Sequence, residues 1–140
     1  MNKENLIVTL NNEAKDAQGS RAGLYILAPN MVNEKRHWLQ QGGIGAMWYC
    51  KNGFLAIGLQ SNINEVECVP QLYAPGDSTG PETATGWKYL KDGGWHETSN
   101  DNDVLVELSN ILLFINHKER YLNYVSTFLS IFDQISSLAH

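Results

Sequence analysis

The sequence predicts a mainly β protein with a C-terminal α-helical segment, in which hairpins build a small antiparallel β-sandwich or barrel. Short runs of β-branched and aromatic residues recur at regular spacing, separated by Gly, Pro, Asn and Asp, a pattern typical of small sandwiches and barrels. After residue 120, apolar residues recur instead at alternating steps of four and three, which is helical spacing. We therefore divide the chain into an antiparallel β domain, residues 1–108, and an amphipathic C-terminal helical tail, residues 109–140.

Composition and charge narrow the classes of partner. Of the 140 residues, 43% are hydrophobic and 18% are charged, which is ordinary for a folded domain. The net charge is −5, without a block of like charges. We therefore expect no nucleic acid and no anionic membrane surface as partner, because both need a basic patch. Polar residues 116–120 interrupt the apolar tail before it reaches the roughly 20 residues of a membrane span.

The N-terminal segment gives an expectation for location. Residues 1–5 are polar and lack the apolar stretch of a signal peptide. We therefore expect a cytoplasmic protein. A secreted protein is the alternative if a leader peptide has been removed.

The segment around Asn52-Gly53 predicts the central hairpin of the β domain. Asn-Gly is the preferred pair for a two-residue type I′ turn, because both central residues need positive φ. Apolar residues then fall on both faces of the two strands, which predicts a strand pair packed between other layers. The pairs that this turn predicts are Cys50 with Leu55, Trp48 with Ile57 and Ala46 with Leu59.

The remaining elements follow from the same signals. Strands are expected at residues 6–10, 23–27, around Trp38 and at 66–69, with a second hairpin over residues 86–97. Residues 11–20 and 71–85 are rich in small and polar residues, and we expect loops there. Residues 104–108 either close the sheet as a last strand or begin the helical part.

The sequence carries no pattern that indicates catalysis or a metal site. None of the familiar nucleophile, phosphate-loop or zinc-protease motifs occurs, and the four histidines stand singly. We therefore expect no enzyme, no cofactor and no metal. His37 and His96 are expected to point to solvent. Cys50 and Cys68 lie in apolar contexts and are expected to be buried free thiols, with a disulfide or a reactive thiol as the alternative.

The order of aromatic residues and glycines resembles a known pattern. It begins with Gly23-x-Tyr25-x-Leu27, Val32-Asn33 and Trp38, continues with Trp48-Tyr49, Phe54 and Ile57-Gly58, and closes with Gly86-Trp87-x-Tyr89 and Gly94-Trp95. The pattern resembles a short β-rich module that occurs singly or repeated in uncharacterised proteins of invertebrates and protists. The resemblance covers about residues 7–108, implies an architecture and implies no catalytic site. Phe54 and Leu55 stand where the module has a tryptophan, and the tail does not belong to it.

Tryptophan gives the candidates for ligand binding. An exposed indole can stack on the apolar face of a sugar or become buried in a protein interface. Trp48 is expected in the core, whereas Trp95 follows a turn and is expected to be accessible. A glycan or small apolar ligand would be held by tryptophans together with the 71–85 loop. The candidate ligand-binding residues are Trp95, Tyr73, Trp87 and Asp77.

The helical tail gives the candidates for self-association. Its apolar face needs a cover, which is either the domain's own sheet or a second copy of the chain. We expect a non-enzymatic interaction module that forms a homo-oligomer through this helix, with a lectin-like domain as the alternative function. The candidate interface residues are Tyr121, Val125, Phe128, Phe132 and Ile135.

Overall fold

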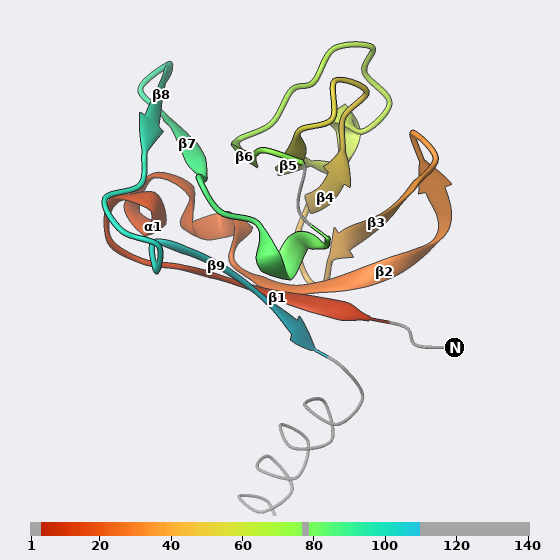
Figure 1. The fold of residues 1–140 in the computed structure, drawn as a ribbon, viewed down its shortest axis with the longest axis horizontal. Coiled ribbons are helices and arrows are strands. Elements are labelled where there is room, and N and C mark those ends of the chain that lie inside the picture. The colour runs from red at the N-terminus through yellow and green to blue at the C-terminus, as the bar shows by residue number, and fades with distance from the viewer. Residues whose placement is uncertain (1–3, 77–78, 110–140) are drawn as a thin grey trace, which may run out of the picture.

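The computed structural model describes residues 4–76 and 79–109, whose strands form one antiparallel sheet (Figure 1). The strands are β1 (Asn5–Leu10), β2 (Gly23–Val32), β3 (Lys35–Gln40), β4 (Gly45–Tyr49), β5 (Leu55–Leu59), β6 (Leu72–Ala74), β7 (Lys88–Lys91), β8 (Gly94–Glu97) and β9 (Val104–Ser109). Their order in the sheet is β8-β7-β6-β5-β4-β3-β2-β1-β9. Consecutive strands are neighbours until the last, which returns to pair with β1. The expectation of a mainly antiparallel β protein is confirmed.

The sheet curls into a half-barrel around a single inner core (Figure 1). Alternate residues of almost every strand point into it, as the two-residue period of a strand requires. Trp38 and Tyr25 are among its largest buried side chains, together with Leu6, Met47, Leu55, Ile57 and Leu72. An open, curled sheet with two edge strands, β8 and β9, takes the place of the closed barrel or two-sheet sandwich expected.

A short helix, α1 (Asn12–Gln18), fills part of the space between β1 and β7, where the sequence predicted a loop. Ala14 is fully buried in the inner core. The Tyr89 hydroxyl donates to the Glu13 carboxylate at 3.1 Å, and the Gln18 side chain donates to the Leu90 carbonyl at 2.8 Å. A helix this short is marginal alone, so its contacts with β7 explain a helix that local composition did not predict. Three one-turn 3₁₀ helices follow elsewhere, at Gly19–Arg21, Gln60–Asn62 and Pro81–Thr83.

The central hairpin is present, but its pairing is shifted by one residue. The turn has three residues, because the Cys50 amide donates to the Phe54 carbonyl at 2.9 Å and Gly53 alone takes a positive φ, +92°. This is a type I turn followed by a glycine bulge, the next most common hairpin connection after the two-residue turns. The observed pairs are Met47 with Ile57, Trp48 with Ala56 and Tyr49 with Leu55.

The prediction that both faces of this hairpin are buried is confirmed. Every residue of β4 is buried, and so are Leu55 to Ile57 and Gly58 of β5. Residues on the inner face join the inner core, whereas those on the outer face form a second cluster, here called the outer cluster. Its buried members are Ala46, Trp48, Cys50, Ala56 and Ile63.

The segment from residue 60 to 71 covers the outer cluster, and we call it the cover loop. The expected strand at residues 66–69 is not formed there. Instead Cys68 forms a disulfide with Cys50 across 18 residues of sequence, with Cα atoms 5.5 Å apart. The expectation of free thiols is therefore wrong, because the loop folds back onto the end of β4. The next strand, β6, begins only at Leu72, inside the expected 71–85 loop.

The approach of the cover loop depends on Gly58. A Cβ atom at this position would lie 3.0 Å from Cη2 of Trp48 and 3.3 Å from the Val69 carbonyl oxygen. The indole therefore lies across the glycine, and the loop backbone lies directly beside it. Both could not approach the sheet this closely if residue 58 had a side chain.

Two other hairpins have the two-residue type I′ turns. Asp92-Gly93 connects β7 and β8 with φ values of +50° and +77°, which confirms the expected second hairpin. Asn33-Glu34 connects β2 and β3 with φ values of +53° and +65°. Glutamate rarely adopts this conformation. The turn is fixed by the Asn33 side chain, which donates to the Tyr49 carbonyl at 2.9 Å.

Strand β2 continues past residue 27, where the expected strand ends, and includes Pro29. The register between β2 and β3 shifts between Leu27 and Met31, so an irregularity accommodates Pro29. This agrees with the general restriction of proline in sheets to bulges and edges.

The last strand, β9, resolves the alternatives for residues 104–108, which close the sheet against β1. Asp103 immediately before it is buried, and its carboxylate accepts hydrogen bonds from the Asn12 side chain at 2.7 Å and from the Ser99 amide and hydroxyl at 2.8 Å. All of these bonds lower the pKa of Asp103, and the bond from Asn12 has the largest effect. The turn before β9 is thereby tied to the start of α1. The predicted helical tail lies outside the described residues.

His37 does not point to solvent as predicted. It is 5% exposed, and within the described part of the chain its Nδ1 atom has no hydrogen-bond partner. It shares the outer face of β3 with Leu39, which packs against the outer cluster. Burial lowers the pKa of His37, and a hydrogen bond with the backbone of Asn30 opposes this effect.

The lowered pKa of His37 predicts a loss of stability in mild acid. The folded state favours the neutral ring, so unfolding takes up a proton once the pH falls below about 6.5, the pKa of an unfolded histidine. We expect the melting temperature to fall between pH 7.5 and 5.5, and to fall less in His37→Leu. Thermal unfolding followed by circular dichroism measures this. The control His96→Leu, at an exposed position, should keep the full fall; equal profiles for His37→Leu and the unmodified protein would contradict the prediction.

Candidate functional site

Three aromatic side chains meet on the outer face of the sheet. Tyr73 of β6 lies between Phe54, immediately before β5, and Trp95 of β8, with ring centroids 5.2 Å and 4.6 Å away respectively. Phe54 is 40% exposed and Trp95 is 43% exposed. We call these three residues the aromatic strip. They form a surface on which an apolar face of a ligand could lie.

The strand register explains why these rings share a face. Tyr73 pairs with Ala56, a member of the outer cluster, and paired residues in a sheet point to the same side. Tyr73 also pairs with Lys88, which in turn pairs with Glu97. A cation and a carboxylate therefore stand beside the rings on the same face. The Tyr73–Trp95 pair is T-shaped, with an interplanar angle of 87°, an arrangement favoured between aromatic rings.

The predicted ligand-binding residues are placed in three different ways. Trp95 and Tyr73 are brought together, and the expected accessibility of Trp95 is confirmed. Trp87 is 3% exposed and lies in the inner core, so it offers no ring face to a ligand. Asp77 lies outside the described residues. So do the predicted interface residues Tyr121, Val125, Phe128, Phe132 and Ile135.

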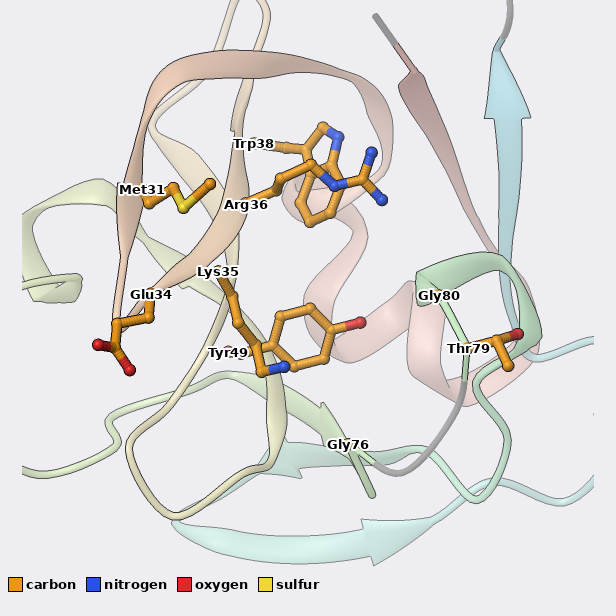
Figure 2. A pocket seen from close by; sticks show the side chains of 9 residues that line it. All are labelled: Met31, Glu34, Lys35, Arg36, Trp38, Tyr49, Gly76, Thr79 and Gly80. Carbon is orange, nitrogen blue, oxygen red and sulfur yellow. The ribbon is translucent and has the colours of Figure 1, made fainter. Parts of the chain in front are cut away.

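A hollow of about 390 Å³ lies elsewhere, beside the Asn33-Glu34 turn, and was not predicted (Figure 2). It is here called the hairpin hollow. Trp38 and Tyr49 supply aromatic surface, Met31 adds an apolar side chain, and Lys35 and Arg36 bring positive charge. The full set of lining residues is Met31, Glu34, Lys35, Arg36, Trp38, Tyr49, Gly76, Thr79 and Gly80.

Each cation of the hollow is held over one of its aromatic rings. The Lys35 Nζ atom lies 5.4 Å from the centre of the Tyr49 ring, and the Arg36 guanidinium lies 5.6 Å from that of Trp38. Both distances are in the range of a cation–π contact. The Arg36 guanidinium also forms an ion pair with Glu4 at 3.2 Å. The Trp38 indole N–H donates to the Glu4 carbonyl at 2.8 Å, so the N-terminal edge of the described chain fixes this wall.

The Tyr49 hydroxyl remains a proton donor. Burial raises the pKa of Tyr49, the negative charge of Glu82 raises it further, and Arg36 lowers it. Figure 2 shows this hydroxyl pointing toward the side on which Thr79 and Gly80 lie. The hollow therefore brings two cations and a neutral hydroxyl together, while the Trp38 and Tyr49 rings lie almost wholly buried beneath the cations.

Part of both surfaces escaped prediction for identifiable reasons. Phe54 departs from the resembled module, but its place next to the hairpin turn indicates that it is exposed. Lys35 and Arg36 belong to the polar stretch that precedes the strand expected around Trp38, and nothing in this stretch indicates a site. The alternation from Lys35 to Gln40 could have indicated that Trp38 points inward on the same side as Arg36, but not that Tyr49 stands opposite.

Within residues 4–76 and 79–109 no group of three metal-ligating side chains is close enough to hold a metal ion. Over the same residues no helix has the length and apolar character needed to cross a membrane.

The chain matches no family model, and neither a curated protein nor a solved structure is significantly similar to it. The resemblance to a β-rich module stays a prediction, and the two surfaces have to be interpreted from their own geometry.

Proposed function

We propose that the β domain is a non-catalytic binding module whose aromatic strip holds a glycan. The observation that carries this proposal is the contact between Tyr73 and Trp95, which leaves Trp95 43% exposed on the outer face. A contiguous exposed apolar patch often marks an interaction site, and Trp and Tyr are the residues enriched where binding energy concentrates.

The surroundings of the strip favour a sugar over a wholly apolar ligand. A sugar ring presents apolar C–H faces and a rim of hydroxyl groups, so it needs an aromatic surface next to polar side chains. Lys88 and Glu97 stand in register with Tyr73 on the same face and could exchange hydrogen bonds with such hydroxyls. Phe54 and Trp95 are both exposed, and Trp95 lies on the edge strand β8. Such a surface suits a chain of sugars more than a small molecule enclosed in a pocket.

The disulfide supports the secreted alternative for location. Structural disulfides persist in oxidising surroundings and are rare in the cytosol. The Cys50–Cys68 bond therefore favours work outside the cytosol, where extended glycans are abundant.

Replacement of Trp95 by Ala tests the proposal. We expect the unmodified protein to retain members of an immobilised oligosaccharide panel, and Trp95→Ala to bind the best of them at least tenfold more weakly, a loss of about 1.4 kcal/mol. Calorimetry measures the affinity. The control is Ile44→Ala, because Ile44 is another exposed apolar residue, at 64%, in the connection between β3 and β4.

The two variants also separate binding from folding. Both should melt close to the unmodified protein, since neither side chain is buried. Equal affinity of the two variants for the same glycan would exclude the strip as the binding surface, and so would the absence of any retained glycan.

A further inference from the structure

We propose that the C-terminal tail folds back and covers the outer face of β1, β2 and β9 of its own chain. These strands are neighbours at one end of the sheet, in the order β2-β1-β9 (Figure 1). We call the apolar side chains on their outer side the bare face, and its members are Ile7, Leu24, Ile26 and Leu105. The aromatic strip lies toward the opposite end of the sheet, so the two surfaces are independent.

The strand register places the bare face opposite the inner core. Alternate residues of β1, β2 and β9 belong to the inner core, so the residues between them point outward. Ile7 pairs with Leu24 across β1 and β2. Ile26 pairs with Leu39, which in turn pairs with Ala46 of the outer cluster. The apolar surface therefore continues from the outer cluster into the bare face.

Within the described part of the chain, the bare face stands outside both apolar clusters. Its four side chains are neither members of the inner core or the outer cluster nor among the apolar residues packed against them. Helix α1 packs on the inner side through Ala14, and the cover loop packs on the outer cluster. Ile26 is 36% exposed, and the other three side chains are partly exposed.

The composition of these strands is that of a sheet covered on both sides. A sheet with one face in water normally alternates apolar and polar residues along each strand. Here Glu107 is the one charged residue in β1, β2 and β9 together. A contiguous apolar patch often marks an interaction surface, so the bare face calls for an occupant.

The length of the tail and the place where it starts identify this occupant. Residues 110–120 follow directly on β9 and can span up to about 36 Å. The six residues of β9 span about 20 Å, so the tail can turn and run back along this strand. The helix predicted over residues 121–139 would be about 28 Å long and, with its side chains, about 10 Å wide. Three neighbouring strands are also about 10 Å across, so one helix matches the bare face.

The charges agree with a helix that runs back along β9. Lys118 and Arg120 come directly before the predicted helix. Glu107 lies on the outer side of β9, two residues before its end at Ser109. A helix that starts near this end brings the opposite charges together. Because exposed ion pairs contribute little stability, their effect is on the direction of the helix.

The covalent connection favours the tail over a second copy of the chain. A segment joined to its site by a short linker has an effective concentration of about 1 mM or more. A second copy would have to exceed this concentration to displace it. Of the two covers that the sequence leaves open, the domain's own sheet is therefore favoured.

The test is nuclear Overhauser spectroscopy of the full chain with ¹³C-labelled methyl groups. We expect contacts within one chain from the methyl groups of Ile7 and Leu24 to the ring protons of Phe128 and Phe132. In a second sample, methyl-labelled and otherwise deuterated chains are mixed with unlabelled chains, so that only contacts between copies give a signal. We expect no signal there. The methyl groups of Val66, which is 81% exposed on the cover loop, are the control and should contact no ring of the tail.

Matched variants of the full chain show that the apolar side of the tail makes these contacts. Phe128→Glu should release the tail, so that the contacts of Ile7 and Leu24 disappear and their methyl signals shift. The signals of Val8 should stay in place, because the inner core is unchanged. Phe128→Leu keeps an apolar side chain and should retain the contacts. Val66→Glu introduces the same charge on the cover loop and should also retain them.

Three results would overturn the proposal. The first is a set of contacts in the mixed sample, which would mean that a second copy covers the bare face. The second is the absence of any contact between the bare face and a ring of the tail. The third is an equal loss of contacts in Phe128→Glu and Val66→Glu, which would reduce the effect to the added charge.

Discussion

Loss of the Cys50–Cys68 disulfide is expected to lower the free energy of unfolding by about 3 kcal/mol, the value for a closed loop of this length. The bond spans 18 residues and holds the cover loop on the outer cluster. Without it the unfolded chain gains freedom, and in the folded state the loop can separate from the sheet. For a domain of about this size, the loss corresponds to a fall in melting temperature of roughly 10–20 °C.

Urea denaturation with and without a reducing agent measures this effect, beside a variant in which both cysteines are replaced by alanine. The reducing agent should destabilise the unmodified protein and leave the double variant unchanged. If the reducing agent changes neither protein, the two cysteines are not bonded in solution.

Trp48→Ala is expected to cost about 3–5 kcal/mol, the range for truncating a large aromatic side chain in a core. The indole is 2% exposed between the outer face of the sheet and the cover loop. Its contact with Gly58 leaves no neighbouring side chain at that position to move into the cavity. Because small domains have total stabilities of about 5–15 kcal/mol, this variant should be close to unfolding at ambient temperature.

Two controls distinguish this loss from a general effect of removing a tryptophan. Trp95→Ala removes an exposed indole and should cost about 1 kcal/mol or less, because little buried surface is lost. Trp48→Ala in the background without cysteines should cost less than in the unmodified protein, since both changes free the same loop and neighbouring effects are not additive. A cost below about 1 kcal/mol for Trp48→Ala would mean that the outer cluster does not contribute to stability as the structure indicates.

The sequence predicts the strands of this domain well because their signal is local. Runs of β-branched and aromatic residues locate β1 and β2, the Asn-Gly signal locates β4 and β5, and Trp38 marks β3, whereas β9 stays open between strand and helix. The register between paired strands is harder to predict than the strands themselves, because the geometry of the turn decides which residues face each other. Asn52-Gly53 has the preferred composition of a two-residue turn and forms a three-residue one, whereas Asn33-Glu34 lacks glycine and forms the two-residue turn. A change of one residue in the turn exchanges the face of every side chain that follows.

The missed elements are those that depend on contacts distant in sequence. Helix α1 is formed by a polar segment that gains its stability from Tyr89 and Leu90. The disulfide depends on the cover loop returning to the end of β4. Neither contact leaves a periodic trace in the sequence, so the propensities of residues 11–20 and 66–69 were misleading.

The aromatic strip was half predicted. Trp95 follows a clear turn signal, and its exposure could be inferred from that position. Trp87 has the same residue type and was placed in the same site, but it lies two residues before Tyr89 and shares its inward direction. Residue type therefore indicated stacking chemistry, whereas the alternation of side chains along the β7–β8 hairpin decides which ring a ligand can reach.

The pairing of β9 with β1 also determines how this domain can be joined to other chains. Asn5 pairs with Ser109, so the first and last residues of the sheet stand about 5 Å apart, the spacing of paired residues in an antiparallel ladder. A segment attached before β1 and one attached after β9 would emerge at the same corner of the molecule. The domain could therefore be inserted into a tight loop of another protein without separating the ends of that loop, and copies joined in series would each need a linker only long enough to reach the next copy.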